Sequence, residues 1–518
     1  MIKSCDVLVV GAGPVGLAAG LLFQRLGINA LLIDRRETMN GHPKARNLKV
    51  RGLEIFRSLG LENAIRQGEF PRDARRVMWL KSFCGEEFAR ISIDNELTTR
   101  YSPCEPAGIS QARLESLIRS SINNIQYETE LVDFVEETDS ILATIKTKTG
   151  ETLQVRAKYM IGADGARSPT RNLLNIPLLK EEELGKFVSI YFKANPYPTA
   201  PYRPSAMYFM LGDATFGRYI QSVNCTDEWL MGIKLGPEMK EFNRDYCLEF
   251  IRETFEMENL DIEILNIDIW HMRLHIAEQF RKGRVFLAGD AAHLLSPAGG
   301  YGLQTGIEDA HNLCWKLAAV IKGQMPEDIL DSYHEERFPV VASNMEWSRN
   351  NQKGYTDIFI AAQSGSKNLL QETISAQWPI LNSIGQDIGF AYKTGCFKPD
   401  GTTAPEITSI KYTPHATPGA RAPHLWLQGP NGKISTIDLF VDSFVLLTDS
   451  NENQWSEAIK NMKIPFRSIS ISEKGEYKDI NNDFHELYGI EKGGAVLVRP
   501  DGHVYWRSAS FCKSSNRT

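Results

Sequence analysis

An apolar run near the start of the chain, residues 6–10, breaks into a glycine-spaced turn over residues 11–16. A helix-like run follows over 17–26, and a second apolar run, 30–33, ends on Asp34. This order of strand, glycine turn, helix, strand and acidic residue is the pattern of a dinucleotide-binding βαβ unit. It constrains the chain strongly, because each part falls where a bound dinucleotide needs it.

Each glycine of this turn has its own physical role. Gly11 permits the tight turn, and Gly13 lets the backbone approach a pyrophosphate at the start of the helix. Gly16 lets the helix pack close to the strand, and Asp34 is positioned to bind a ribose hydroxyl. The alternative, a glycine-rich turn in an ordinary βαβ unit, is disfavoured by the flanking elements and the acidic residue. The predicted turn comprises Gly11, Gly13, Pro14, Val15 and Gly16.

Size and composition narrow the class of protein. A chain of 518 residues is too long for one core, so we expect about two to four domains. The formal net charge of −6 argues against a protein that neutralises nucleic-acid phosphates. The longest apolar stretch, 7–23, contains the glycine turn, which explains it better than a targeting or membrane segment does. We therefore expect a cytoplasmic protein that binds neither nucleic acid nor a membrane.

The eight cysteines are scattered along the chain without CxxC or metal-ligand spacing. In a cytoplasmic chain this pattern predicts reduced, mostly structural thiols. We expect no metal site.

The pattern changes along the chain. From about 187 to 268, short alternating runs with aromatics predict a sheet-rich insertion. The α/β pattern returns at 284–289, and helices are expected over 305–322 and 329–345. A Pro/Gly/Thr-rich stretch, 399–423, predicts a linker before a small C-terminal α/β domain.

Two further segments each combine an apolar run with a small-residue turn that carries a carboxylate. Residues 159–168 read Tyr-Met-Ile-Gly-Ala-Asp-Gly-Ala-Arg-Ser and contain Asp164. Residues 283–293 read Gly-Arg-Val-Phe-Leu-Ala-Gly-Asp-Ala-Ala-His and contain Asp290. Taken singly, either segment is typical of an ordinary turn. Both together, in this order behind the glycine turn, are far more specific.

With these motifs the chain resembles the flavoprotein aromatic hydroxylases, the FAD-dependent single-component monooxygenases typified by p-hydroxybenzoate hydroxylase and phenol hydroxylase. The resemblance covers essentially the whole chain. It is closest to members that act on phenols and aromatic polyketides, because of residues 297–306, Pro-Ala-Gly-Gly-Tyr-Gly-Leu-Gln-Thr-Gly, and the matching run 308–317.

The resemblance implies an α/β fold in which an inserted sheet-rich substrate domain interrupts a Rossmann-like FAD-binding domain. Its first part would span 1–180, with a substrate-side excursion near 71–104. The substrate domain would span 181–270, and the second FAD-binding part with a helical connection 271–400. Residues 408–518 would form a thioredoxin-like domain. Because this domain lacks a CxxC motif, we assign it no redox function. We expect it to have a structural or dimer-contacting role.

The resemblance also implies which residues of this chain contact FAD, because they occupy the positions of the family's FAD-binding residues. Asp34, where the family usually has Glu, would bind the adenosine ribose, and Asp290 the ribityl hydroxyls and pyrophosphate region. Arg35 would lie near adenine, and the turn with Asp164 and Arg167 is associated with both FAD and NAD(P)H. The implied FAD-binding residues are Gly11, Gly13, Pro14, Val15, Gly16, Asp34, Arg35, Arg46, Gln111, Val132 (through its backbone, to adenine), Asp164, Asp290, Gly300, Gly302, Leu303 and Gln304.

The glycine-rich loop at 299–305 has a physical role beside these contacts. Reduced flavin carries negative charge near N1 and O2, and the start of the helix expected at 305–322 supplies unpaired backbone N–H groups. We place Leu303 and Gln304 there. Preorganised donors stabilise the developing charge without reorganisation.

The implied reaction is oxygenation. NAD(P)H, as NADPH or NADH, would reduce FAD transiently; no second nucleotide fold is apparent for it. A flavin C4a-hydroperoxide formed with O2 would transfer oxygen to a small aromatic substrate in a site that excludes water. A homodimer is the expected assembly.

No catalytic residue is assigned from the sequence. Pro297, Tyr301 and Arg46 are candidates near the flavin. His293 is more typical of a structural residue than of a base. Six further residues on and after the inserted sheet are candidates for substrate activation, although each taken alone is more typical of a packed or surface side chain. They are Tyr191, Tyr208, Arg218, Tyr219, His271 and Arg273.

Two other functions stay open. The same fold supports Baeyer–Villiger or quinone-forming oxygenation, and the sequence does not show the pocket that would decide. A different class is a non-oxygenating FAD-binding module. Asp290 and the 299–302 loop disfavour it, because a mere binder has no need of a site for reduced flavin.

Overall fold

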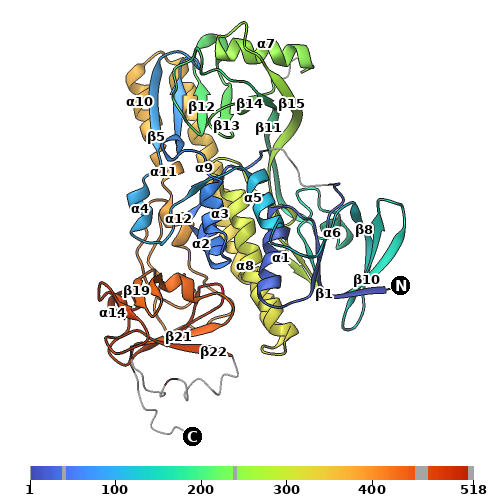
Figure 1. Ribbon diagram of the computed structural model, residues 1–518, viewed down its shortest axis with the longest axis vertical. Coiled ribbons are helices and arrows are strands. Elements are labelled where there is room, and N and C mark those ends of the chain that lie inside the picture. The colour runs from blue at the N-terminus through green and yellow to red at the C-terminus, as the bar shows by residue number, and fades with distance from the viewer. Residues whose placement is uncertain (1, 38–42, 237–241, 450–454, 456–464, 511–518) are drawn as a thin grey trace.

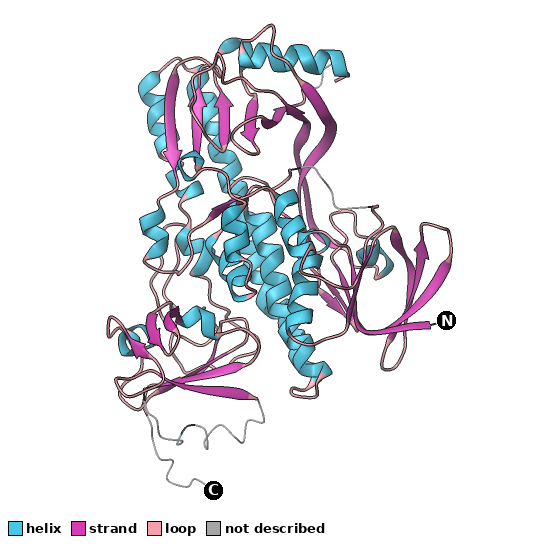
Figure 2. Ribbon diagram, in the orientation of Figure 1, coloured by secondary structure: helices cyan, strands magenta, loops and turns pink. Residues whose placement is uncertain are grey.

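The computed structural model describes residues 2–37, 43–236, 242–449, 455 and 465–510. Among these residues two eight-stranded sheets form the main body, and a smaller C-terminal unit adds sheets of three and four strands (Figure 1). Long helices run between the two large sheets (Figure 2). None of the helices within the described ranges is long and apolar enough to cross a membrane.

The first large sheet has a parallel centre built from the motif-bearing segments. β1 (Ile2–Val10) lies between β2 (Ala30–Ile33) and β10 (Thr152–Gly162), and β17 (Val285–Leu287) follows β10. Near-continuous apolar runs form these strands, because both faces of a parallel sheet are covered. The carboxyl ends of β1, β10 and β17 therefore bring their three following turns to one edge of the sheet.

The expected helix after the glycine turn is α1 (Pro14–Arg25). It packs between the sheet and α8 (Tyr301–Ile321). A Cβ on Gly16 would lie 1.8 Å from the carbonyl oxygen of Gly11, so only glycine allows this approach of helix and strand.

Two helix predictions need correction. The helix expected to start at 305 begins four residues earlier, at Tyr301, because Gly300 adopts φ 72° as its N-cap and turns the chain directly into α8. The helix expected over 329–345 is α9 (Ser332–Gln363), which continues past an internal Pro339 toward the second sheet.

The second large sheet contains the predicted insertion and more. β11 (Leu178–Lys193) and β15 (Glu263–Ala277) are long antiparallel strands that pair along most of their length. They connect the two sheets, so β11 crosses the predicted boundary at 180/181. From β11 the sheet continues through β14 (Glu228–Lys234), β13 (Tyr219–Ser222) and β12 (Met207–Met210).

Residues within the predicted excursion complete this sheet. β4 (Arg76–Leu80) pairs with β12, and β5 (Glu87–Ser92) forms the edge. Helix α7 (Arg244–Phe255), which the strand pattern did not predict, covers one face over an aromatic core that includes Phe83 and Trp229.

The C-terminal unit follows a stretch, 399–419, without helix or strand. In its larger sheet β21 (Phe444–Thr448) pairs with parallel β22 (Phe466–Ser470) and antiparallel β24 (Ala495–Val498). The helix expected near 453–462 falls almost wholly outside the described residues.

The described residues also contain shorter helices and strands. They are β3 (Asn47–Leu48), α2 (Val50–Ser58), α3 (Glu62–Gln67), α4 (Asn95–Thr99), β6 (Ala107–Gly108), α5 (Gln111–Arg119), β7 (Ile125–Gln126), β8 (Thr129–Glu136), β9 (Ile141–Thr147), α6 (Pro169–Leu173), β16 (Arg281–Lys282), β18 (His293–Leu294), α10 (Lys367–Ser375), α11 (Trp378–Leu381), α12 (Ile384–Ile388), β19 (Trp426–Gly429), β20 (Gly432–Ser435), β23 (Lys478–Asp479), α14 (Phe484–Tyr488) and β25 (Val504–Ser508).

Buried ion pairs join the C-terminal unit to the helices of the first domain. Glu336 of α9 accepts from Lys316 of α8 at 2.8 Å and from Arg499 at 2.7 Å, and all three side chains are inaccessible to solvent. Burial alone would raise the pKa of Glu336, but Arg499 and Lys316 outweigh it and lower the pKa from 4.5 to about 2. The carboxylate is therefore charged, and it balances two buried cations.

Glu336→Gln is expected to destabilise the protein by about 3–5 kcal/mol, because it removes the carboxylate that Lys316 binds and leaves Arg499 with Asp501 alone. Denaturant unfolding followed by tryptophan fluorescence measures this, with the exposed neighbour Glu335→Gln as the control. Since the folded pKa is depressed, the contribution of Glu336 is present above pH 4.5 and lost as pH falls toward 2. Equal stability of the two variants at pH 7 would contradict the role of this network.

Candidate active site

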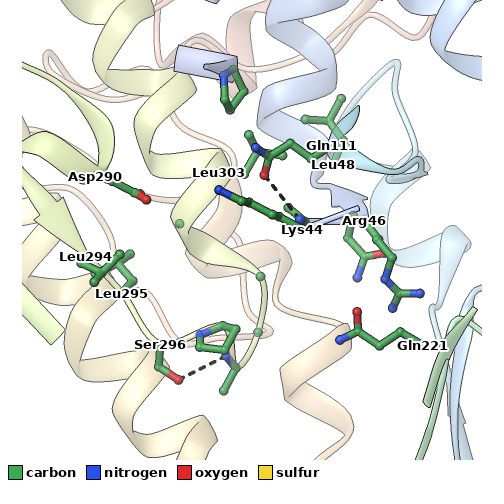
Figure 3. Close-up of a pocket in the computed structure, with 18 of the residues that line it drawn as sticks. Lys44, Arg46, Leu48, Gln111, Gln221, Asp290, Leu294, Leu295, Ser296 and Leu303 are labelled. Atoms are coloured by element: carbon green, nitrogen blue, oxygen red, sulfur yellow. Dashed lines mark hydrogen bonds between the residues drawn. The ribbon is translucent and has the colours of Figure 1, made fainter. Parts of the chain in front are cut away.

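One continuous cavity of about 1080 Å³ runs between the two large sheets. It begins beside Asp34, passes the start of α8 and ends against β12, β13 and β15 of the second sheet. Single small-molecule pockets span about 300–1000 Å³, so this cavity has room for more than one small ligand. Figure 3 shows part of it, with Asp290 and Ser296 on one wall and Arg46 and Gln221 on the other.

Most residues predicted to contact a cofactor lie in the wall of this cavity. So does Pro297, a candidate for substrate proximity. The predicted residues that line the cavity are Gly11, Gly13, Pro14, Val15, Asp34, Arg35, Arg46, Gln111, Asp164, Asp290, Pro297, Gly300, Gly302 and Leu303.

Three predicted residues lie outside the wall of the cavity. Gly16 faces Gly11 within the βαβ unit and serves packing. The side chain of Val132 is 48% exposed, and residues 129–131 line the cavity instead. Arg167 is exposed.

Two further predicted residues are buried behind the wall. Gln304 lies within the first turn of α8 and donates to Glu308 at 3.1 Å. Because α8 begins at Tyr301, the free N–H groups belong to residues 301–303, and Gln304 is not among them. The ring of Tyr301 is 2% exposed and lies under the ammonium of Lys49, 4.5 Å from the ring centre.

Asp34 is held in place at one end of the cavity. Its Oδ2 accepts from the backbone N–H of Ala12 at 2.7 Å, and Arg36 donates to both carboxylate oxygens. Burial opposes ionisation, but these hydrogen bonds outweigh it and lower the pKa of Asp34. Asp34 is therefore a fixed anion beside the glycine turn. Sequence reasoning singled out Arg35 and missed Arg36.

The turn after β10 is fixed by its own carboxylate. Asp164 accepts from the hydroxyl of Ser168 and from the backbone N–H of Thr170, at 2.9 Å, so it closes the turn into α6. A Cβ on Gly11 would lie 2.3 Å from the carbonyl oxygen of Ala163. The first and second motifs therefore touch, and the side chain of Asp164 is engaged in holding its own turn.

Asp290 follows β17 and is exposed to the cavity. The surrounding protein raises its pKa, while His293 and Lys44 oppose that rise. In Figure 3 the side chain of Lys44 extends toward Asp290 across the cavity. A carboxylate and an ammonium thus face each other over open space, where they can bind hydroxyl and phosphate groups.

A buried network behind Asp290 positions its turn. Asp309 of α8 accepts from the backbone N–H of Gly289 at 3.1 Å and bonds His293 Nε2 at 2.6 Å. Arg337 donates to the other oxygen of Asp309 at 2.8 Å. His293 is 1% exposed, which agrees with its predicted structural role.

The loop 297–300 brings the start of α8 to the cavity. Gly299 and Gly300 have φ 92° and 72°, a region that favours glycine. A Cβ on Gly300 or Gly302 would meet no atom within 4 Å, so the backbone is open to a ligand here. The first backbone N–H groups of α8 form a site for negative charge.

Arg46 and Gln111 stabilise the wall of the cavity that lies opposite Asp290. Arg46 is buried and donates to the backbone carbonyls of Ala206, at 2.7 Å, and Ser222. Burial without a neighbouring carboxylate lowers its pKa to about 10. Gln111 accepts from Ala45 N–H at 3.4 Å and so anchors the loop before Arg46 (Figure 3).

The far lobe of the cavity is lined by rings and a few amides. Gln221 lies in its wall, and its Oε1 is buried without a hydrogen-bond partner in the described part of the chain. Such an orphaned acceptor indicates a ligand or water that donates to it. The aromatic residues of the lobe are Phe187, Phe209, Phe216, Tyr219, Trp270, Tyr355 and Phe359.

Of the candidates for substrate activation on the inserted sheet, Tyr219 lines the cavity. Tyr208 is buried and donates to the carbonyl of Arg203 at 2.7 Å, and Arg218 pairs with Glu253 at 2.6 Å. The remaining three are engaged away from the cavity: Tyr191 donates to Glu228, and His271 and Arg273 contact Glu183.

Sequence reasoning missed several residues that line the cavity, and no local signal marks them. Lys49 and Asp387 are separated by more than three hundred residues and meet only through tertiary packing.

The residues that line the cavity fit the chemical groups of FAD. A Cβ on Gly13 would also meet no atom within 4 Å, so the backbone at both helix starts is open to a ligand. The groove connects the anion of Asp34 to the helix start at Gly302 through the Lys44–Asp290 pair. An extended dinucleotide requires these groups: a carboxylate that accepts from ribose hydroxyls, and two helix N-termini that bind its negatively charged groups.

Comparisons with known proteins agree with this geometry. A family model described as FAD binding domain matches residues 4–348, and one described as aromatic-ring hydroxylase, C-terminal, matches residues 415–516. The chain is 31% identical to a putative polyketide hydroxylase of Streptomyces halstedii, over 97% of this chain and 93% of that protein. It is 28% identical to phenol 2-monooxygenase of Pseudomonas sp. (strain EST1001), over 98% and 90%.

Solved structures show the same architecture. The flavin-dependent monooxygenase PieE, in complex with FAD and substrate, superposes with a TM-score of 0.90 at 28% identity, covering 98% of this chain and 96% of that one. Aklavinone-11 hydroxylase, with FAD and aklavinone, gives 0.84 at 27% identity and covers 99% and 97%. The chain therefore belongs to the FAD-binding aromatic-ring hydroxylase family and is a flavoprotein monooxygenase.

Proposed function

We propose that this protein uses FAD and NAD(P)H to hydroxylate a phenolic or polycyclic aromatic compound of the polyketide type. One observation carries the proposal: the aromatic lobe is continuous with the dinucleotide groove, and they meet at the start of α8. A ring bound in the lobe would therefore lie beside the reactive end of the cofactor. The relatives that act on phenols and polyketides support this substrate class.

The polar groups along the groove have separate roles in this proposal. Asp34 accepts from the adenosine ribose, sharing its oxygens with Arg36. Asp290 and Lys44 hold the ribityl and phosphate region. The backbone N–H groups of residues 301–303 stabilise negative charge on the reduced ring, because they are fixed before that charge develops.

When bound, FAD supplies the redox chemistry, taking a hydride from NADH or NADPH and activating O2. The protein orients the substrate and excludes water from the site. Phe209, Tyr219 and Trp270 pack against the substrate ring and exclude water, which protects the activated oxygen from wasteful breakdown. Arg46 holds the wall between the lobe and the groove through its two backbone carbonyls.

Three further expectations remain proposals. NAD(P)H binds transiently, without a nucleotide fold of its own. The four-stranded C-terminal sheet, with parallel β21–β22 and antiparallel β24–β25, supports a thioredoxin-like unit with a structural role. The protein forms a homodimer.

Oxygenation of a ketone on the same fold is the second candidate. The aromatic lining of the lobe suits a flat aromatic ring and favours hydroxylation. A non-oxygenating FAD-binding module is disfavoured, because the open start of α8 and the aromatic lobe beside it serve no purpose in a protein that only binds FAD.

The function is tested with purified, FAD-loaded enzyme. Phenols and polycyclic hydroxyaromatics should accelerate oxidation of NADH or NADPH, and mass spectrometry should find the product heavier by one oxygen atom. A ketone converted to an ester would favour the second candidate. Rapid NAD(P)H oxidation without any oxygenated product from either class would contradict oxygenation.

Asp290→Ala should weaken FAD binding at least tenfold, about 1.4 kcal/mol, because it removes the carboxylate that faces the groove. Equilibrium titration of apoenzyme with FAD, followed by flavin fluorescence, measures the dissociation constant. Asp268→Ala removes a carboxylate from the other end of the same cavity and should bind FAD normally. Equal dissociation constants for the two variants would refute the role of Asp290.

Gly13→Ala places a methyl group in open space where the pyrophosphate is expected, so the apoprotein should fold with unchanged Tm. Its affinity for FAD should fall about tenfold or more, because one misplaced group at a close backbone approach costs at least 1–2 kcal/mol. Gly236→Ala, at an exposed loop position where an added Cβ would likewise meet no described atom within 4 Å, is the control. Unchanged FAD affinity in Gly13→Ala would contradict the predicted approach.

A further inference from the structure

The sheet that lines the aromatic lobe carries one amide in the middle of an apolar row. Gln221 of β13 pairs with Met207 of β12 on one side and with Leu230 of β14 on the other. Paired residues of neighbouring strands point to the same face of a sheet, and all three line the cavity. The amide therefore stands between two apolar side chains, where a hydrogen bond is stronger than in water and an unmade one costs more.

The amide of Gln221 makes no hydrogen bond among the residues that the structure describes. Its Oε1 is buried without a partner. Its Nε2 is open to the cavity, and Figure 3 shows the amide projecting from its wall into the space that separates it from Ser296. Two N–H donors and one acceptor oxygen are thus unused, which points to a bound molecule at this place.

Arg46 fixes the backbone that carries this amide. It donates to the carbonyls of Ala206 and Ser222, which are the chain neighbours of Met207 and Gln221. The ends of β12 and β13 are therefore held together from inside the protein. Because the strand is in place before a ligand arrives, a hydrogen bond to Gln221 costs little ordering of the protein.

The next row of the sheet forms an aromatic floor beside Gln221. A Cβ on Gly232 would lie 2.1 Å from Cζ of Tyr219 and 2.2 Å from its hydroxyl oxygen, so the Tyr219 ring lies across Gly232. Burial raises the pKa of Tyr219 to about 12, and a hydrogen bond with Ser189 opposes the rise. Ser189 also accepts from Nε1 of Trp270 at 2.9 Å. Both rings are neutral, and their polar atoms are engaged with Ser189.

The other polar side chains of the lobe are paired or hydrated. Gln352 accepts from the hydroxyl of Ser296 at 3.3 Å. Three further polar residues of the lobe are exposed, where water can bind them: Lys234, Asp268 and Thr356. Among the described side chains of the lobe that are not exposed, Gln221 is therefore the one whose polar atoms are all unused.

The amide lies at the end of the lobe away from the loop that leads into α8. At the other end, Oγ of Ser296 contacts Sδ of Met272 at 3.9 Å, and Trp270 precedes Met272 on the same face of β15. The row of Gln221 lies two rows from that of Trp270, about 13 Å along the strands. A single ring covers about one such row, whereas fused rings can extend from the α8 end to Gln221.

We propose that Gln221 selects aromatic substrates with fused rings that carry a second oxygen substituent, a hydroxyl or a carbonyl, at the β13 end of the lobe. The inference rests on the proposed function, hydroxylation at the start of α8. Nε2 donates to the substituent oxygen while the ring system packs on Tyr219. A half-turn of the amide exchanges Nε2 and Oε1 without changing its shape, so it can also accept from a hydroxyl. Gln221 thus acts on substrate choice and not on the reacting atoms.

The test compares two naphthols that differ by one group of similar size. The compound 2,6-dihydroxynaphthalene carries a hydroxyl where 6-methyl-2-naphthol carries a methyl group. Binding to the FAD-loaded enzyme is titrated from the change in flavin absorbance, and mass spectrometry follows product formation. The wild type should bind the dihydroxy compound about tenfold more tightly, a difference of about 1.4 kcal/mol, because the methyl group leaves the amide unpaired.

Gln221→Met removes the amide and keeps the length of the side chain. This variant should bind the two naphthols with equal dissociation constants. Its Tm should stay unchanged, because the amide has no hydrogen bond with the described residues to lose, whereas a structural role would lower the Tm. Gln371→Met, at an exposed position of α10, is the control and should keep the preference of the wild type.

The outcomes separate this inference from the function on which it rests. Equal dissociation constants for the two naphthols in the wild type overturn the role of Gln221, whether or not the variant folds. A Gln221→Met variant that keeps the preference overturns it as well. A wild type that prefers the dihydroxy compound but oxygenates neither that compound nor any other phenol overturns the proposed function alone.

Discussion

The structure depends on how closely three strand ends approach one another. The turn at Gly11 touches the turn at Ala163, and the turn at Gly289 touches Val15 at the start of α1. A single Cβ at Gly11 or Gly16 would collide with a backbone oxygen. Because these turns lie so close together, Asp34, Asp164 and Asp290 all line one shared cavity.

The same closeness explains the chemistry of the site. Two helices, α1 and α8, begin at this edge of the sheet, so two sets of free N–H groups face one groove. The carboxylate of Asp309 holds the Gly289 turn from behind, and Arg337 balances its charge. These bonds hold the turn in position without a ligand, as electrostatic stabilisation of a reduced cofactor requires.

The sequence predicted those parts of the fold that depend on interactions between residues close together in the chain. The strand expected over 30–33 follows from its short apolar run and is confirmed as β2. The start of α8 was predicted four residues late, since its N-cap is a glycine with positive φ, and no capping side chain marks it. The position of Val132 reflects the irregular pairing of β8 with β9 between Leu131 and Asp133, which shifts the strand relative to the cavity.

Tertiary packing decides the rest. Lys49 and Asp387 belong to distant segments, and nothing in their neighbours predicts that they line one cavity. Nor did the sequence reveal the buried ions that join the C-terminal unit to α8 and α9. Through these contacts a unit without redox cysteines among its described residues joins the helices that carry the active site.

The central claim is that one cavity holds the cofactor along the three turns and the aromatic substrate at the start of α8. A crystal structure with FAD and a phenol bound tests it most directly. We expect the adenosine at Asp34, the flavin ring against Gly300 and Leu303, and the phenol over that ring among Tyr219 and Trp270. A flavin ring outside this cavity, or a phenol bound apart from it, would contradict a shared site for cofactor and substrate.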